Sequence, residues 1–318
     1  MAYMRYYRSK LSENEKNAYD QFVLGIAKRR DRIELPYVSG DELERVYYAL
    51  NYDYPDFFYL NFVQYVYTTT PNCVYVDMPY LMSFDEAVRV KAQIDEKARK
   101  IADAVKGMSD IDKEAYIHDA LRKMAVYDTN TSHPLNAHNL IGPFLEGKCV
   151  CEGFAKSFKY LADMVNLKSI IVLGTGGAMG ENKEPHSWNM VRIDGNNYHL
   201  DVTYDEIYNG YISRAYFNLS DLEILRDHTL DGVFELPRCT KNQNTVPVIS
   251  STADLMRFLK YESERNVRCS EMRLTKRFSI EEIENMISRK ATYTDYEWIN
   301  KISSYTKGSY AFLVWWRV

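Results

Sequence analysis

Three side chains within a short stretch of the chain could together make a reactive thiol. Cys151 stands where a helical pattern begins, His186 opens a β-rich run, and Asp201 lies within the next β-rich run. A thiol attacks a carbonyl as the thiolate, an imidazole takes and returns the proton, and a carboxylate orients the imidazole. The order and proximity of these residues predict a Cys–His–Asp site for acyl transfer.

The residues that follow Cys151 predict a helix with one apolar face. Apolar side chains recur there at helical spacing, at Phe154, Phe158, Leu161 and Val165. The first turn of a helix offers free backbone N–H groups and the positive end of the helix dipole, and both favour a thiolate. The same N–H groups can bind the oxyanion that forms when a carbonyl is attacked. We therefore expect the sulfur at the N-terminus of a buried helix.

Cys149 is the competing thiol, but it stands before the helical pattern and lacks the help of the dipole. Cys149 and Cys151 could instead hold a metal ion together with His138. Zinc sites usually space their cysteines by about two to four residues and supply a second pair, which this chain lacks. The other cysteines are scattered, at Cys73, Cys239 and Cys269. We therefore expect neither a metal nor a cofactor, and Cys149 is predicted to pack beside the site.

The two β-rich runs are predicted to form a hairpin about the Asp-Gly pair at 194–195. The register we expect pairs Ile193 with Tyr198. Because side chains alternate along a strand, His186 and Asp201 then point to the same face. Roughly 13 Å of strand would still separate them in this register, so a bulge, a bend or strong twist is required to bring them together.

Other residues near these strands carry weaker signals. Trp188 shares a face with His186 by the same alternation, so it could wall the site or fill the core. A lone histidine in a helix, strand or loop is usually structural. That is the role predicted for the remaining histidines, which are His118, His133, His138, His199 and His228.

These motifs resemble the transglutaminase-like superfamily, and its bacterial members most of all. The resemblance spans about residues 106–230. It is carried by Val-Cys-Glu-Gly-Phe-Ala at 150–155, His-Ser-Trp-Asn at 186–189 and Tyr-His-Leu-Asp-Val-Thr-Tyr-Asp at 198–205, with further similarity at 117–128 and 140–148. Two positions depart from the family pattern, since Ser187 stands where Ala is frequent and Tyr204 where Trp is frequent.

The resemblance implies a papain-like α+β core, in which a cysteine-bearing helix packs on an antiparallel sheet that carries the histidine and the aspartate. Carried over to this chain, the catalytic residues are Cys151, His186 and Asp201. The implied reaction is acyl transfer from amides through a thioester, with an amine or water as the acceptor. The family leaves the second oxyanion donor unmatched. Tyr127 is a candidate for it, and we expect Tyr127 and Trp188 on the substrate-binding side.

Composition limits the other functions open to the chain. Of its 318 residues, 46% are hydrophobic and 26% charged, which is typical of a globular protein. No apolar run approaches the roughly 20 residues that span a bilayer. The net charge of −4 and the absence of a basic stripe argue against a nucleic-acid partner. We expect a peptide or protein substrate, without nucleic acid or a membrane as partner.

The N-terminus shows charge but no apolar stretch of a secretory signal, and the cysteines are few and scattered. Both observations favour a cytoplasmic protein, or a secreted one if the N-terminus has been processed or truncated.

The chain is predicted to contain three parts. They are an N-terminal α+β segment at 1–105, a transglutaminase-like catalytic core at 106–245 and a small C-terminal α/β domain at 246–318. The spacing of Ser and Glu predicts helix N-caps at Ser12, Ser39, Ser83 and Ser279. The C-terminal part has the element order of a small ferredoxin-like unit, with helices predicted at 252–264 and 280–289.

Two classes of function compete for this sequence. One is a cysteine-dependent enzyme, either a peptidase that uses water or a transglutaminase that admits an amine. The other is a catalytically inactive scaffold of the same fold that binds proteins or glycans. Loss of a triad residue would have favoured the scaffold, and none is lost.

Overall fold

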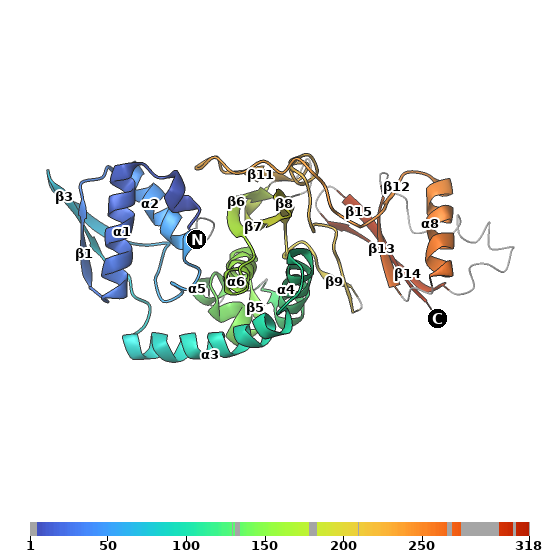
Figure 1. Cartoon of the computed structure of the whole chain (residues 1–318), viewed down its shortest axis with the longest axis horizontal. Coiled ribbons are helices and arrows are strands. Elements are labelled where there is room, and N and C mark those ends of the chain that lie inside the picture. The colour runs from blue at the N-terminus through green and yellow to red at the C-terminus, as the bar shows by residue number, and fades with distance from the viewer. Residues whose placement is uncertain are drawn as a thin grey trace.

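The helices and strands of this chain fall into three groups along its long axis, as Figure 1 shows. The structure is a computed structural model and describes residues 5–128, 130, 134–177, 183–208, 210–265, 269–274, 299–307 and 310–317. Helices and strands are mixed throughout, so the predicted α+β class is confirmed. The division into domains at 105 and 245 stays a prediction.

The N-terminal group packs two helices against a three-stranded antiparallel sheet of order β1-β3-β2. Its elements are η1 (Tyr7–Lys10), α1 (Glu13–Ala27), β1 (Arg32–Pro36), α2 (Gly40–Asp53), β2 (Val66–Thr69) and β3 (Cys73–Asp77). Ser12 and Ser39 cap α1 and α2 with complete capping boxes, as predicted. Ser83 caps the long α3 (Phe84–Ala104), which runs from this group beneath the central one (Figure 1).

The central group is built on a four-stranded antiparallel sheet of order β11-β6-β7-β8. Its strands are β6 (Ser169–Gly176), β7 (Glu184–Ile193), β8 (Asn196–Leu200) and β11 (His228–Leu230). Helix α6 (Cys151–Met164) packs on β6 and β7. The Asn189 side-chain amide on β7 donates to the Ala155 carbonyl of α6 at 3.0 Å, which ties the sheet to the helix.

Further elements surround this sheet. They are α4 (Asp110–Met124), β4 (Val126–Tyr127), α5 (Pro134–Ala137), η2 (Gly142–Glu146), β5 (Lys148–Cys149), β9 (Ile207–Tyr208), β10 (Tyr211–Ile212) and α7 (Asp221–Ile224). The two-residue strands β4 and β5 pair in parallel, and β5 leads directly into α6.

The hairpin register differs from the one predicted. Ile193 pairs with Asn196 rather than with Tyr198, so only Asp194 and Gly195 form the turn. Both residues have positive φ, 47° and 80°, as the favoured two-residue hairpin turn requires. If this register is continued by one residue, Asp201 lies opposite Trp188, two residues from His186 along β7. The predicted register placed Asp201 four residues from His186. The predicted register was wrong because the four-residue loop assumed for it is longer than an Asp-Gly turn needs.

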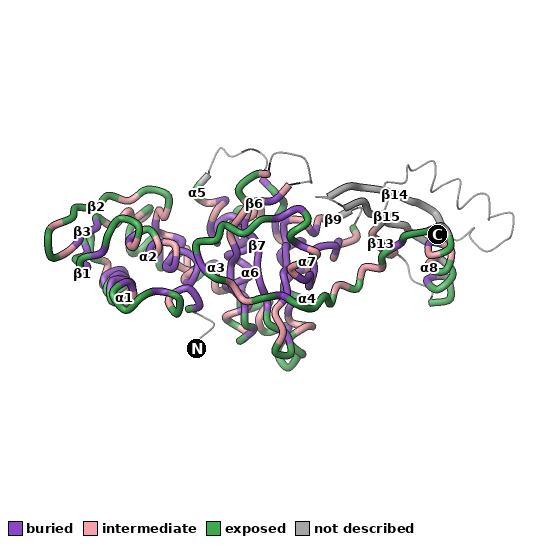
Figure 2. The backbone as a smooth tube through the Cα atoms, turned by 90° about the horizontal axis from the view of Figure 1, so that it is seen from above, coloured by how far each residue is buried: buried purple, intermediate pink, exposed green. Residues whose placement is uncertain are grey.

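Buried residues gather around α6 and β7, where the tube in Figure 2 is mostly purple. One apolar cluster joins residues of α1 and α2 to Ala155, Ile171 and Trp188 of the central group. The Tyr7 hydroxyl donates to the Ile171 carbonyl. The N-terminal elements therefore support the sheet and the helix that carry the predicted site.

The C-terminal group is a four-stranded sheet of order β12-β13-β15-β14 with one described helix. Its elements are β12 (Val248–Ile249), α8 (Thr252–Glu264), β13 (Cys269–Leu274), β14 (Ile299–Lys307) and β15 (Tyr310–Arg317). Helix α8 has the predicted bounds. The N-cap predicted at Ser279 and the helix predicted at 280–289 lie outside the described residues. Among the helices that the structure does describe, none is long and apolar enough to cross a bilayer.

Candidate active site

Cys151 is the first residue of α6, as the sequence pattern predicts. The N-cap residue, Val150, makes no side-chain cap, so the backbone N–H groups of the first turn are not taken by a capping group. A Cβ on Gly153 would lie 2.4 Å from the Ala137 carbonyl oxygen, and the Val150 N–H donates to that same oxygen at 3.1 Å. Glycine at 153 therefore lets the start of the helix approach α5 closely.

The structure brings His186 and Asp201 together. The Nε2 atom of His186 lies 2.7 Å from Oδ2 of Asp201. The other carboxylate oxygen accepts the backbone N–H groups of Thr203 and Tyr204, at 2.9 and 3.2 Å. Asp201 is fully buried and directly follows β8. Its carboxylate is therefore held by the backbone on one side and faces the imidazole on the other.

The Cys151 thiol and the His186 ring are hydrogen-bonded to each other. Because Nε2 faces Asp201, Nδ1 is the ring nitrogen left for the sulfur. Burial by itself would raise the pKa of Cys151, but the hydrogen bond and charge of His186, together with the Ser187 backbone N–H, outweigh it, so this pKa lies below its ordinary value. The surroundings of the sulfur therefore favour its thiolate form.

The pKa of His186 is displaced in the opposite direction. Burial lowers it, but the charge and hydrogen bond of Asp201, followed by those of Cys151, raise the pKa to about 10. Burial would raise the pKa of Asp201, yet His186 and then His228 hold it far below its usual range. These displacements favour a thiolate–imidazolium pair backed by an ionised carboxylate.

Aromatic rings surround the imidazole. Trp188 is 1% exposed and stacks behind His186, with ring centroids 5.9 Å apart. Tyr204, which replaces the tryptophan frequent in the family, lies on His186 at 4.9 Å. A Cβ on Gly176 would come within 2.7 Å of the Tyr204 hydroxyl and 3.2 Å of the His186 ring. Glycine at 176 therefore makes room for both rings, and Trp188 shields the imidazole from behind.

Tyr127 is on β4, about half exposed, and its pKa is raised to about 12 by burial and by the nearby charges of Cys151 and Asp201. Its backbone pairs with that of Cys149, two residues before Cys151 in the chain. Its roles as oxyanion donor and substrate contact, and the substrate contact predicted for Trp188, stay predictions. Cys149 is fully buried, and burial raises its pKa far above that of an ordinary thiol, so it is the inert partner of the two cysteines.

Two residues of the network were missed by the sequence reasoning. His228, predicted to be structural, lies with Nε2 3.1 Å from Oδ2 of Asp201. Its Nδ1 lies 2.6 Å from the carboxylate of Asp227. The adjacent Asp and His in the sequence were the only available signal, because the short elements β9, β10 and α7 separate the pair from Asp201 and no strand period links them.

The other histidines lie elsewhere. His118 is buried between Asp119 and Asp205, and His138 bonds Glu152 at 2.8 Å. The ring of His199 accepts the indole N–H of Trp188 at 2.9 Å, behind the site. His133 lies outside the described residues.

Within the described part of the chain, two groups of three side chains come close enough together to hold a metal ion: His186, Asp201 and His228, and His199, Asp221 and Cys239. In the first group, hydrogens on the imidazole nitrogens make the bonds to Asp201. In the second, the Trp188 N–H occupies Nδ1 of His199, so Nε2 must carry the hydrogen that Asp221 accepts at 3.1 Å. Neither group offers the free nitrogen lone pairs that a metal needs.

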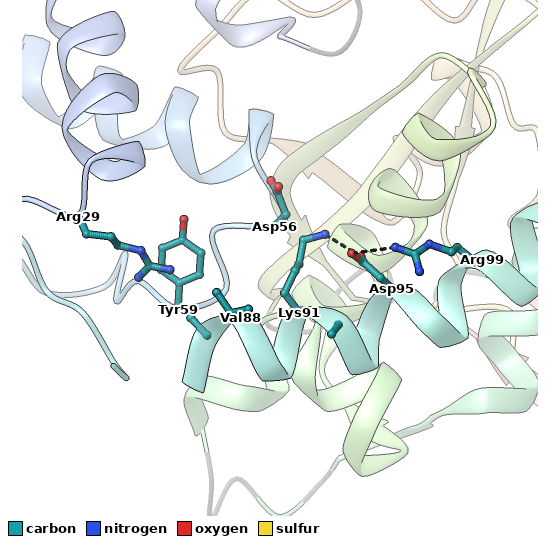
Figure 3. Close-up of a pocket in the computed structure, with 9 residues that line it drawn as sticks. Arg29, Asp56, Tyr59, Val88, Lys91, Asp95 and Arg99 are labelled. Carbon is teal, nitrogen blue, oxygen red and sulfur yellow. Dashed lines mark hydrogen bonds and ion pairs between the residues drawn. The ribbon is translucent and has the colours of Figure 1, made fainter. Parts of the chain in front are cut away.

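A pocket of about 430 Å³ opens between the N-terminal group and α3 (Figure 3). Lys91 bonds Asp95 at 2.7 Å there, Arg99 lies 3.7 Å from Asp95, and the Arg29 guanidinium stacks on Tyr59. The residues that line it include neither thiol nor imidazole. The chemistry predicted for this chain therefore belongs to the site at the start of α6.

Comparison with known proteins finds a family model that matches the central part of the chain. Residues 95–202 match the family model of the Transglutaminase-like superfamily, which supports, in coarse terms, a cysteine-dependent activity. A search of curated proteins finds no match.

Among the solved structures that are similar to the chain are the following two. One is a TGase, at 14% identity over 69% of this chain and 59% of that chain, with a TM-score of 0.34. The other is the periplasmic domain of TgpA from Pseudomonas aeruginosa, at 12% identity over 42% of this chain and 54% of that chain, with a TM-score of 0.29. The chain thus spans less than two thirds of either structure. The match to the family model of the Transglutaminase-like superfamily covers residues 95–202, about a third of the chain.

Proposed function

We propose that this protein is a cysteine-dependent enzyme that transfers acyl groups from peptide or glutamine-type amides through a thioester on Cys151. The observation that supports the proposal most strongly is the hydrogen-bonded series from the Cys151 sulfur through His186 to Asp201, at the N-terminus of a buried helix. The pKa of each member is displaced in the direction that favours the charge that acyl transfer by a thiol requires.

In the first half-reaction, the Cys151 thiolate attacks the amide carbon. The negative charge on the carbonyl oxygen is met by N–H groups of the first turn of α6, with Tyr127 as a candidate second donor. His186 then gives the proton on Nδ1 to the leaving nitrogen as the carbon–nitrogen bond breaks. An amine departs, the thioester remains, and His186 is left neutral beside Asp201.

In the second half-reaction, neutral His186 takes a proton from the acceptor as that acceptor attacks the thioester. Water gives a free acid, and an amine gives a new amide. In both cases the sulfur leaves as the thiolate, and the imidazolium that stabilises it is restored. A peptidase and a transglutaminase therefore share every residue of the proposed triad and differ in the acceptor that reaches the thioester.

Alkylation by iodoacetamide, followed by mass spectrometry of each cysteine peptide, separates the enzyme from an inactive scaffold. We expect Cys151 to react fastest, with half-buried Cys73 and buried Cys239 as internal comparisons. His186→Ala should remove that advantage. Equal labelling of Cys151 and Cys73 in the unmodified chain would overturn the proposal.

A second assay separates the two enzymes. A library of glutamine-containing peptides is incubated with the chain and a labelled primary amine, and both incorporated amine and released acid are measured. Amine incorporation identifies a transferase and acid release alone a hydrolase, while Cys151→Ala should show neither product. Products that persist in Cys151→Ala would exclude the thioester.

A further inference from the structure

A second imidazole shares the carboxylate that orients His186. Oδ2 of Asp201 lies 2.7 Å from Nε2 of His186 and 3.1 Å from Nε2 of His228. His228 is fully buried at the start of β11, and its Nδ1 faces Asp227 at 2.6 Å. A carboxylate oxygen in these contacts can only accept, so each imidazole donates an N–H to the same oxygen.

An oxygen that accepts hydrogen bonds from two donors binds each of them more weakly than it would bind one donor alone. A carboxylate that already accepts one hydrogen bond is a weaker acceptor for the next, because each donor neutralises part of the negative charge. Asp201 accepts four N–H groups, two from imidazoles and two from the backbone. Asp201 therefore attracts the proton on Nε2 of His186 less than a carboxylate that faced His186 alone would, and it stabilises the imidazolium less.

We propose that His228 is a positioning residue of the site: by donating to Oδ2 of Asp201, it weakens the stabilisation of the His186 imidazolium by Asp201 and eases transfer of the Nδ1 proton to the leaving amine. The inference rests on the proposed acyl transfer. An imidazolium that is stabilised too strongly is a poor general acid, because a general acid is most effective when its pKa lies near the operating pH. Asp227 fixes the second nitrogen of His228 and so sets the direction of the bond to Asp201.

The surroundings allow this role to be tested without dismantling the site. Asp201 keeps its two backbone donors when His228 is replaced, so the carboxylate stays oriented. Asp227 keeps the Tyr216 hydroxyl, which donates to it at 2.6 Å. The titratable groups that face the two imidazoles are Cys151, Asp201, Tyr204, Tyr216 and Asp227, with His199 beyond them.

His228→Phe removes both N–H groups and keeps a ring against Trp188 and Tyr204, whose centroids lie 4.9 and 4.8 Å from that of His228. His228→Asn is the second variant, since its amide is too short to reach Asp201 but stays polar beside Asp227. His228→Gln can place an amide N–H near the lost Nε2 and should restore the interaction in part. The matched control is His199→Phe, because His199 is equally buried and bonds a carboxylate but does not face Asp201.

The primary measurement is the titration of the His186 ring in the full chain, followed by NMR of ¹⁵N-labelled histidine. We expect the midpoint to rise by about 0.5–1 pH unit in His228→Phe and His228→Asn, the equivalent of roughly one ordinary hydrogen bond. His228→Gln should fall between these variants and the unmodified chain, and His199→Phe should not move the midpoint. An unchanged or lowered midpoint in His228→Phe, or an equal rise in His199→Phe, would overturn the inference.

The second measurement compares a peptide amide with an activated aryl ester, whose leaving group departs without a proton. The ratio of amide to ester turnover should fall by about three- to tenfold in His228→Phe and stay constant in His199→Phe. A constant ratio in both variants would also overturn the inference. If the His186 midpoint rises as expected but the unmodified chain shows no amide turnover, the proposed function is refuted. The conclusion that two imidazoles share Asp201 would then still hold.

Discussion

His186 and Asp201 meet across the open end of the β7–β8 hairpin, with Nε2 and Oδ2 2.7 Å apart. The two residues are not cross-strand partners, because β8 ends at Leu200 and the register continues Asp201 toward Trp188. The carboxylate reaches the imidazole diagonally and is held there by the N–H groups of Thr203 and Tyr204. The two-residue turn at Asp194 and Gly195 thus makes unnecessary the bulge that the longer predicted loop would have required.

Replacing Asp201 by Asn should reduce amide turnover by about 10²–10⁴-fold with little change in KM, because the amide can no longer stabilise the imidazolium or fix its tautomer. Steady-state kinetics on the peptide that the library assay selects provide the measurement. Asp205→Asn is the matched control, since Asp205 is equally buried but faces His118. Equal losses in both variants would mean that only folding was affected.

Reactivity and turnover should depend on pH in different ways. The pKa of Cys151 is lowered, because His186 and the Ser187 N–H outweigh the opposing effect of burial, so alkylation should stay fast at pH values where an ordinary thiol near 8.5 is protonated. The pKa of His186 is raised to about 10, so amide turnover should fall only as the pH approaches that value and the proton for the leaving amine is lost.

Rates of iodoacetamide labelling and of amide turnover, each measured from pH 5 to about 10.5, test this pH dependence. Cys73 supplies the labelling reference within the same chain. A labelling midpoint for Cys151 at or above that of Cys73 would contradict the predicted thiolate.

Gly176→Ala should impair the site more than the fold. The added Cβ would lie 2.7 Å from the Tyr204 hydroxyl and 3.2 Å from His186, so one of these rings must move. We expect turnover and Cys151 labelling to fall by about tenfold or more, since a small misplacement of a reacting group is costly. Gly40→Ala is the control, because its Cβ would meet only the Tyr67 hydroxyl at 3.4 Å. Unchanged labelling of Gly176→Ala would show that the rings have room to adjust.

Glu152→Gln should destabilise the chain by about 3 kcal/mol near neutral pH, because it removes the charge that compensates buried Lys156. Lys156 lies 2.9 Å from Glu152, with side chains 8% and 19% exposed, and it also donates to Asn51 of α2 at 2.7 Å. Urea denaturation measures the difference. The control is Glu96→Gln on α3, whose partner Lys100 has the same helical spacing but whose side chains are 70% and 72% exposed, so it should have almost no effect.

The same pair predicts a pH dependence of stability. Burial would raise the pKa of Glu152, but Lys156 and His138 lower it to about 2, below the usual 4.5. A carboxylate whose pKa is lower in the folded than in the unfolded state stabilises the fold at pH values above its unfolded-state pKa. This stabilisation is lost as the pH falls toward the folded-state pKa. The difference between Glu152→Gln and the unmodified chain should therefore be full above about pH 4.5 and shrink toward pH 2. A difference that does not change with pH would contradict the ion pair.

Local patterns were sufficient to predict the helix that begins at Cys151, the N-caps at Ser12 and Ser39, and the hairpin about Asp194 and Gly195. Each depends on residues close together in the chain, through helical periodicity, capping hydrogen bonds or turn geometry. The register of the hairpin was the exception. It depends on how many residues the turn takes up, and the predicted pairing of Ile193 with Tyr198 was two residues too long.

By itself, the sequence determined which side chains could act as nucleophile, base and orienting carboxylate, because their types and order are local properties. Only the tertiary structure decided that a single oxygen of Asp201 serves both His186 and His228. His228 reaches the site because β11 pairs with β6 next to Gly176. Strand pairing between distant segments follows from the packing of the whole sheet, and no spacing within the chain encodes it.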